Sequence, residues 1–227
     1  MRKVAVIMYG PPGAGKGTQA NLLAKKYDLI HFNTGEIMNN VVHDPARQKE
    51  AVIQRERKLF DAGKLMTPSF VFREVARETN KIAKAKLGII FSGSPRTMYE
   101  ASKLIPILEK LYGKKNIYVF ELVLSPSESI ARNSKRMWCS ICGYTLLSQY
   151  YPSSRPKHCP VCGGPFYKRK DDNAKVISNR LKEYKDRTEP IFGFLKDRGY
   201  KLNIIDASPA PYKIFLKLQN DYFKNAR

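Results

Sequence analysis

A glycine-rich turn near the start of the chain limits what the rest of it can fold into. Residues 3–9 form a short apolar run with β-branched side chains, which is typical of a strand buried in a parallel sheet. Three glycines and two prolines follow within residues 10–15, and a helical pattern begins near Thr18. A turn that joins a strand to a helix in this way presents backbone N–H groups at the helix N-terminus, where they can bind an anion. Glycine is needed there, because side chains block both the turn and the approach of a phosphate.

A lysine in this turn points to a nucleotide as the anion. Lys16 places an ammonium group where the terminal phosphates of a nucleotide lie in phosphate-binding loops. The sequence departs from the usual G-x-x-x-x-G-K-[ST] pattern, because Gly17 follows the lysine and Thr18 comes one position later. A glycine loop that binds no ligand is the alternative, and the flanking strand and helix make it the weaker interpretation.

Apolar strand candidates recur along the chain with helical segments between them, at residues 3–9, 29–32, 87–92, 117–124 and 201–205. Strands that alternate with helices predict an α/β fold, here a doubly wound five-stranded parallel sheet with helices on both faces. Ligands of such folds bind beyond the carboxyl ends of the strands. We therefore expect the functional residues to follow the strands directly.

Two insertions interrupt this alternation. Helices expected at 35–43 and 46–62, the first capped by Asn33 or Thr34, form a small flap. A second insertion contains the cysteines, between a helix that carries Arg132 and Arg136 on one face and a long helix that ends near residue 197. The predicted division is a flap at residues 33–66, a cysteine-containing insertion at 135–172, and a core domain formed by 1–32, 67–134 and 173–227.

The composition limits which binding partners and which cellular compartment are expected for the protein. The 227 residues carry a formal net charge of +21, which favours polyanions such as nucleotides, nucleic acid or acidic membranes, although solubility alone can also explain it. The basic residues are scattered, with no stripe of interleaved aromatic side chains beyond three lid tyrosines, so nucleic acid is the less favoured partner. We see no signal peptide and no apolar run of membrane-spanning length, and we expect a soluble, cytoplasmic protein with no membrane partner.

The four cysteines form two C-x-x-C pairs separated by sixteen residues. This spacing allows Cys139, Cys142, Cys159 and Cys162 to surround one Zn²⁺ tetrahedrally. Four reduced cysteines without a metal are the alternative. With all four positions filled by thiolates no water is bound, so the zinc is expected to be structural. His158 is expected to be a neighbour of the site, while His31 and His43 are expected to serve packing or solvation.

Arginines bracket the cysteine-containing insertion and follow the third strand. Arg96 lies in the turn after that strand, where a ligand of the sheet is expected. Most exposed arginines face water, but four that flank one insertion opposite a phosphate loop are better explained as a clamp on polyphosphate. These four are Arg132, Arg136, Arg169 and Arg180.

Taken together, these motifs resemble those of the adenylate kinases of the long type, which carry a zinc-binding lid. The resemblance covers essentially the whole chain, and the motifs fall in family order. They are G-P-P-G-A-G-K-G-T-Q-A at residues 10–20, N-T-G-E at 33–36, D-A-G-K-L at 61–65, G-S-P-R-T at 93–97, the C-x2-C-x16-C-x2-C spacing, and R-K-D-D at 169–172.

The resemblance implies roles for individual residues. ATP is expected to contact Gly13, Ala14, Gly15, Lys16, Gly17, Thr18, Arg132, Arg136 and Thr145. The monophosphate is expected to contact Thr34, Asn39, Lys64, Leu65, Met66, Gly93, Arg96, Glu100, Arg169 and Arg180. The groups expected to act in catalysis are the cations Lys16, Arg96, Arg132, Arg136, Arg169 and Arg180.

The implied activity is that of an ATP-dependent nucleoside monophosphate kinase, most simply ATP + AMP = 2 ADP. Mg²⁺ is expected to accompany ATP and to bridge its β- and γ-phosphates, while cations neutralise the transferring group. Closure of the lid (residues 135–172) is expected to exclude water and to align donor with acceptor, so no general base is needed. The resemblance also implies a monomer.

Three positions depart from the family pattern. Asn39 stands where an arginine usually contacts the monophosphate, and loss of a charged hydrogen bond is worth roughly 1.5–3 kcal/mol. Ser92 stands where an aspartate usually organises the waters of magnesium. Glu100 stands where a glutamine usually recognises adenine, and a carboxylate accepts hydrogen bonds but does not donate them.

These departures leave alternatives open. The chain can be a variant with another monophosphate preference, GMP for example, since Glu100 can accept from guanine. It can also be a degenerate member that binds nucleotide with weak turnover, which Ser92 favours and Lys16 opposes. A nucleic-acid-binding zinc ribbon is the third alternative.

Overall fold

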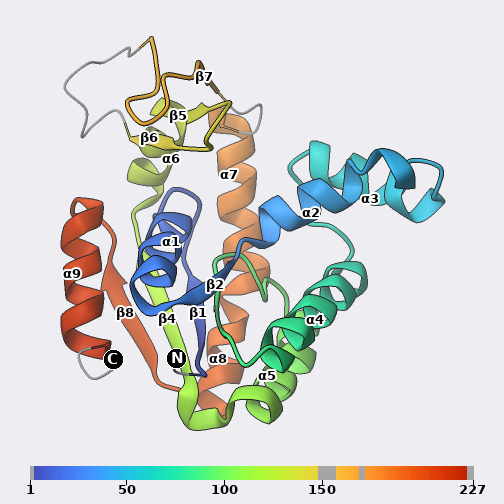
Figure 1. Ribbon diagram of the computed structural model, residues 1–227, viewed down its shortest axis with the longest axis vertical. Coiled ribbons are helices and arrows are strands. Elements are labelled where there is room, and N and C mark those ends of the chain that lie inside the picture. Colours follow the sequence, from blue (N-terminus) through green and yellow to red (C-terminus); the bar gives the residue numbers. More distant parts are fainter. Residues whose placement is uncertain (1–2, 148–156, 169–171, 224–227) are drawn as a thin grey trace.

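The central element of the fold is a parallel sheet of five strands (Figure 1). The computed structural model describes residues 3–147, 157–168 and 172–223. The strand order β2-β3-β1-β4-β8 confirms the doubly wound topology expected from the sequence. Its strands are β1 (Ala5–Tyr9), β2 (Leu29–Phe32), β3 (Gly88–Phe91), β4 (Ile117–Val123) and β8 (Leu202–Asp206).

Both faces of the sheet are covered by helices, and the alternation of β1 shows how. Ala5 and Ile7 enter one apolar core, while Val6 and Met8 enter the other. The first core contains side chains of α4 (Pro68–Lys84), α5 (Met98–Tyr112) and α8 (Pro190–Asp197). The second contains side chains of α1 (Lys16–Tyr27) and α9 (Pro211–Tyr222). A 3₁₀ turn, η2 (Lys114–Asn116), leads into β4. Within the described residues, no helix has both the length and the hydrophobicity needed to cross a membrane.

The helices of the flap (residues 33–66) extend away from the sheet (Figure 1). They are α2 (Thr34–Val42), the 3₁₀ turn η1 (Pro45–Arg47) and α3 (Ala51–Asp61). Asn33, one of the two expected caps, caps α2 by accepting a hydrogen bond from Glu36 N at 3.4 Å. The helix expected at 46–62 begins only at Ala51, because the Asp44 side chain accepts from Ala46 N at 2.9 Å and stabilises the 3₁₀ turn instead.

The lid carries a small antiparallel sheet of its own, in the order β6-β5-β7. Helix α6 (Pro126–Lys135) leads into β5 (Arg136–Cys139), which pairs with β6 (Thr145–Leu147) and with β7 (Phe166–Tyr167). The expectation that Arg132 and Arg136 share one helix face is wrong. The helix ends at Lys135, and Arg136 has extended backbone with φ −70° and ψ 139°.

A nearly continuous helical segment descends from the lid through the core (Figure 1). It consists of α7 (Ala174–Glu183), a π-helical turn η4 (Tyr184–Thr188) and α8. The long helix predicted to end near Asp197 is therefore present, but a π-turn interrupts it. Within that turn Thr188 Oγ1 donates a hydrogen bond to Arg96 O at 3.0 Å, which links this helix to the turn after β3.

Candidate functional site

The glycine-rich turn forms an open cradle at the carboxyl end of β1. Gly10 has φ +143°, and a Cβ placed on it would lie 2.5 Å from Leu122 O, so no side chain fits at this position. Gly15 has φ +84° and ends the turn in the left-handed conformation, after which α1 begins at Lys16. A Cβ on Gly15 or Gly17 would meet nothing within 4 Å, so the outer side of the turn is open to a ligand.

Lys16 lies at the centre of a group of cations. Its Nζ donates hydrogen bonds to Gly10 O at 2.6 Å and Pro11 O at 2.9 Å, within its own turn. Burial lowers the pKa of Lys16 well below its usual value, and the positive charges of three arginines lower it further. These arginines, Arg96, Arg136 and Arg180, come from three different parts of the chain. The fold therefore concentrates positive charge beside an open anion cradle.

Two of the predicted clamp arginines are held by protein groups near the base of the lid. Arg136 Nε donates to Asp172 Oδ2 at 3.1 Å, and Arg136 Nη2 donates to the other oxygen of that carboxylate, which is buried. Arg132 donates to Ala207 O and Ser208 O, each at 2.8 Å, beyond the end of β8. Both guanidinium groups are thus oriented before any ligand binds. Arg169 lies outside the described residues.

A second group of candidate residues meets where α2 begins, beside the turn after β3. The hydroxyl of Thr34 is buried and has no hydrogen-bond partner among the described residues. Arg96 Nε donates to Gly93 O at 2.7 Å, and burial lowers the pKa of Arg96. A Cβ on Gly93 would lie 3.0 Å from Arg96 Nη2 and 3.3 Å from Thr34 Cβ. Thr34, Gly93 and Arg96 therefore come together as predicted from their motifs, with an unsatisfied hydroxyl among them.

The remaining residues expected around a monophosphate differ in their exposure to solvent. Asn39 and Lys64 are exposed in the flap, Leu65 is half-buried and Met66 is buried. Thr145, expected near ATP, is half-buried in β6, where it pairs with Trp138.

Glu100 has a structural partner that the sequence reasoning missed. Its Oε1 accepts a hydrogen bond from Thr97 Oγ1 at 3.0 Å, and its Oε2 accepts from Arg96 N at 2.9 Å. Glu100 N in turn donates to Thr97 Oγ1 at 3.3 Å, so the two side chains form a capping box at the start of α5. Burial raises the pKa of Glu100, and these hydrogen bonds oppose that shift. The T-x-x-E pattern at residues 97–100 is the signal that predicts this arrangement.

His31 was expected to serve packing or solvation, but it makes two specific hydrogen bonds. Its Nδ1 is 2.6 Å from Asn21 Oδ1, and its Nε2 is 2.7 Å from Ser92 Oγ. Burial lowers the pKa of His31 to about 4, so the ring is neutral at physiological pH. No short motif joins these residues, because Ser92 lies sixty-one positions from His31 in the sequence.

The four cysteines meet in the lid as predicted. Their Sγ atoms all lie within 4.8 Å of one another. The Cys139 and Cys162 sulfurs are 3.4 Å apart, and those of Cys142 and Cys159 are 3.7 Å apart. Tetrahedral Zn²⁺ with Zn–S bonds of about 2.3 Å requires sulfurs roughly 3.8 Å apart, so the donor set fits this metal.

Backbone donors support thiolate character at this cluster. Ile141 N donates to Cys139 Sγ at 3.4 Å, and Val161 N donates to Cys159 Sγ at 3.5 Å, the same arrangement in each pair. Backbone hydrogen bonds lower the pKa of Cys139. His158 is outside the cluster, and its Nδ1 is 3.2 Å from Gly163 O. All four candidate metal ligands are therefore cysteine sulfur atoms.

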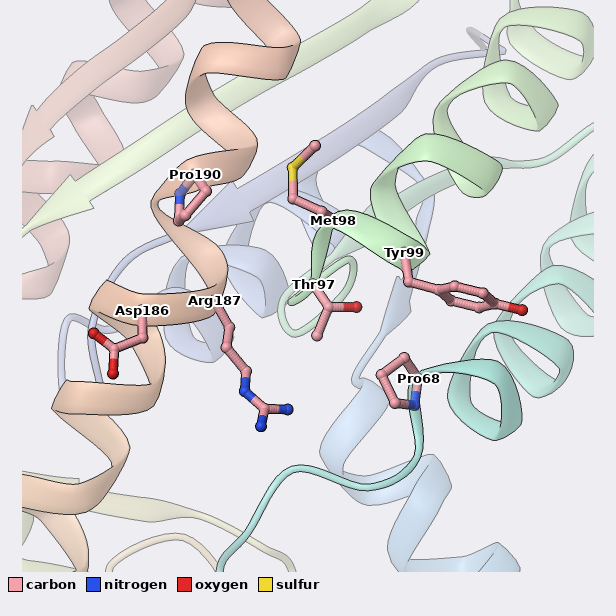
Figure 2. Close-up of a pocket in the computed structure, with 7 residues that line it drawn as sticks. All are labelled: Pro68, Thr97, Met98, Tyr99, Asp186, Arg187 and Pro190. Atoms are coloured by element: carbon pink, nitrogen blue, oxygen red, sulfur yellow. The ribbon is translucent and has the colours of Figure 1, made fainter.

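A shallow pocket of about 310 Å³ lies between the starts of α4 and α5 and the π-turn, away from the cysteines. Figure 2 shows Arg187 extending from the π-turn toward the side of the pocket that Thr97 and Pro68 line. None of the residues predicted to bind a nucleotide lines this pocket. Its lining consists of Pro68, Thr97, Met98, Tyr99, Asp186, Arg187 and Pro190.

Comparison with known proteins agrees with the motifs. A family model described as adenylate kinase matches residues 8–200 of the chain. An adenylate kinase from Methanothrix thermoacetophila is 34% identical over 200 residues, which cover 88% of this chain and 89% of that protein. Adenylate kinases from Caldicellulosiruptor bescii and Bacillus cytotoxicus are each 33% identical, over 195 and 199 residues. The alignments cover 86% and 88% of this chain, and 87% and 89% of those proteins.

The cysteine cluster leads to a prediction about metal content and stability. We expect one zinc per wild-type chain by elemental analysis and loss of most of that zinc in Cys142→Ser, because a tetrahedral site loses one of its four ligands. We also expect Tm to fall by at least about 5 °C, since each kcal/mol corresponds to roughly 2–4 °C for a chain of this size. Val161→Ala is the matched control, because its side chain is exposed on the same lid and its sulfur neighbours remain. Full zinc content in Cys142→Ser contradicts the four-sulfur site.

Proposed function

The chain belongs to the adenylate kinase family, and we propose that its ATP and AMP meet across the cations around Lys16. The family reaction is reversible phosphoryl transfer, ATP + AMP = 2 ADP. The observation that carries the proposal is the convergence of Arg96, Arg136 and Arg180 on the ammonium of Lys16. A polyphosphate bound in the cradle of residues 10–18 adds negative charge beside these cations.

On the ATP side, the phosphates bind to the backbone N–H groups at the N-terminus of α1 and to Lys16. The ammonium exchanges its hydrogen bonds with Gly10 O and Pro11 O for phosphate oxygens. Arg132 and Arg136 contact ATP from the base of the lid, and Thr145 contributes from β6. The existing bonds of these arginines to Ala207, Ser208 and Asp172 hold the guanidinium groups in place, which reduces the entropy lost on binding.

On the AMP side, the monophosphate binds among Thr34, Gly93 and Arg96. The unpaired hydroxyl of Thr34 gains a hydrogen-bond partner there, and the absence of a side chain at Gly93 leaves room for it. Lys64, Leu65 and Met66 line the flap side. We place Asn39 at the same edge, where its amide gives a weaker contact than a cation.

Catalysis in this arrangement is positioning and charge neutralisation. Lys16 and the arginines balance the charge on the transferring group, while Arg169 and Arg180 reach both phosphate chains. Closure of the lid and the flap excludes water from the donor and aligns it with the acceptor. Mg²⁺ bound with ATP would supply further neutralisation of phosphate charge beside Lys16.

We assign the zinc in the lid a structural role. A four-sulfur site leaves no position for water, so it does not take part in the transfer. We further propose that the enzyme is a cytoplasmic monomer that acts on free nucleotides.

A panel of acceptors tests the proposed function. With ATP·Mg²⁺ as donor, we expect AMP to be phosphorylated at least about tenfold faster than GMP, CMP or UMP in a coupled assay, a difference of about 1.4 kcal/mol. Glu100 is occupied by its capping box, so it does not select guanine. GMP turnover above AMP turnover would overturn the choice of acceptor. Tight nucleotide binding without any transfer would indicate a degenerate member.

The exposed flap position 39 leads to a second prediction. Asn39→Arg restores a cation next to the monophosphate and is expected to lower the KM for AMP about tenfold or more, with the KM for ATP unchanged. Asn40→Arg is the matched control, because it adds the same charge at the adjacent exposed residue. An unchanged KM for AMP in Asn39→Arg means that another cation already fills this role.

A further inference from the structure

Helix α6, which leads from β4 to the lid (Figure 1), holds the phosphate-binding turn through a buried serine. Ser129 Oγ donates a hydrogen bond to Pro12 O at 2.6 Å, although the two residues are 117 positions apart in the sequence. Both residues are buried. A hydrogen bond that is shielded from water is electrostatically stronger than an exposed one, so it constrains the direction in which the carbonyl of Pro12 points.

A second side chain of α6 packs against the next residue of the turn. Asn133 lies four residues after Ser129, so the two side chains share one face of the helix. Asn133 Nδ2 donates to Ser129 O at 2.7 Å, which fixes the amide beside the turn. A Cβ placed on Gly13 would lie only 2.6 Å from this nitrogen. The carbonyl of Pro12 and the α-carbon of Gly13 are therefore both confined by α6.

The peptide bond between Pro12 and Gly13 carries this constraint to the opposite side of the turn. The bond is trans and planar, so its C=O and its N–H point in opposite directions. Because the C=O points toward α6, the N–H of Gly13 points away from that helix. Within the part of the chain that the structure describes, no group accepts a hydrogen bond from Gly13 N, and Gly13 is half-buried. This donor is available to a ligand.

We propose that Ser129 is a positioning residue that aims the N–H of Gly13 at a phosphate of ATP. This inference rests on the proposed binding of ATP in the cradle of residues 10–18. Ser129 acts through the carbonyl of Pro12, which shares one rigid peptide unit with that N–H. A loop that is fixed in this way loses less conformational entropy when it binds a ligand.

The contacts of Lys16 explain why the turn needs a hydrogen bond from another element. Lys16 Nζ donates to Gly10 O at 2.6 Å and to Pro11 O at 2.9 Å, and in the proposed function it exchanges both for phosphate oxygens. The bond from Ser129 to Pro12 O does not involve the ammonium, so it stays in place during that exchange. The turn thus keeps one fixed carbonyl while Lys16 moves.

The same helix connects the turn with the base of the lid. Arg132, which is proposed to contact ATP, directly precedes Asn133 in α6. The N–H of Arg136 donates to Asn133 O where the helix ends. One rigid element therefore sets the distance between the cradle and two arginines of the proposed ATP site.

The test compares Ser129→Ala with the wild type by titration calorimetry. Its affinity for a non-hydrolysable ATP analogue and for inorganic tripolyphosphate is expected to fall about three- to tenfold, as for the loss of one hydrogen bond. AMP affinity is expected to stay unchanged. Ser134→Ala is the matched control, because it makes the same change on the same helix, and no hydrogen bond of the Ser134 side chain occurs within the described residues. This control is expected to bind both probes as the wild type does.

NMR spectroscopy of the Gly13 amide separates positioning from packing. The amide resonance of the wild type is expected to shift when the ATP analogue binds, and the shift is expected to be smaller in Ser129→Ala. A purely structural role predicts a lower Tm with unchanged affinity and an unchanged Gly13 shift, and that result would overturn the proposal.

A second variant tests whether the two side chains act on the same peptide unit. Asn133→Ala is expected to weaken binding of the ATP analogue, and the double variant with Ser129→Ala is expected to lose less than the sum of the two single losses. Full additivity contradicts a shared action on the Pro12–Gly13 peptide.

Phosphoryl transfer by the wild type is measured in parallel with these titrations. Its absence contradicts the proposed function. Wild-type transfer together with unchanged affinity of Ser129→Ala for the ATP analogue contradicts only the role of Ser129.

Discussion

Burial of the Lys16 ammonium beside other cations is the constraint on which the candidate site depends. Burial lowers the pKa of Lys16 well below its usual value, and the positive charges of Arg96, Arg180 and Arg136 lower it further. Carbonyl oxygens of the turn and the carboxylate of Asp172 offset part of this positive charge. A polyphosphate in the proposed cradle is expected to offset this charge further.

The cations belong to segments that are also linked to one another. Arg136 and Asp172 form an ion pair between the two ends of the lid, where β5 begins and where the chain enters α7. Lower on the same helical segment, Thr188 holds the carbonyl of Arg96. A ligand that draws these guanidinium groups together therefore acts on the lid, on the helix below it and on the turn after β3. The cysteine cluster joins the two C-x-x-C pairs of the lid, which is the part of the chain that a metal is expected to stabilise.

Local patterns in the sequence predicted most of the fold. The apolar runs predicted the five strands, and the paired cysteines predicted the cysteine cluster, because both signals lie within a few residues. Three features depended on contacts that local patterns do not contain: the π-turn before α8, the extended backbone of Arg136, and the bonds of His31 to Asn21 and Ser92. Glu100 is different, because its hydrogen bond with Thr97 lies within the local T-x-x-E pattern at residues 97–100.

In the proposed function, the loop around Lys16 and the group of Thr34, Gly93 and Arg96 form two halves of one site. Binding of a bisubstrate dinucleotide, with two adenosines joined by five phosphates, tests this directly. We expect one molecule bound per chain, with affinity about 10²–10⁴-fold above that of ATP alone. An affinity no higher than that of ATP would contradict it, because the second adenosine and its phosphate would then have no place in the site.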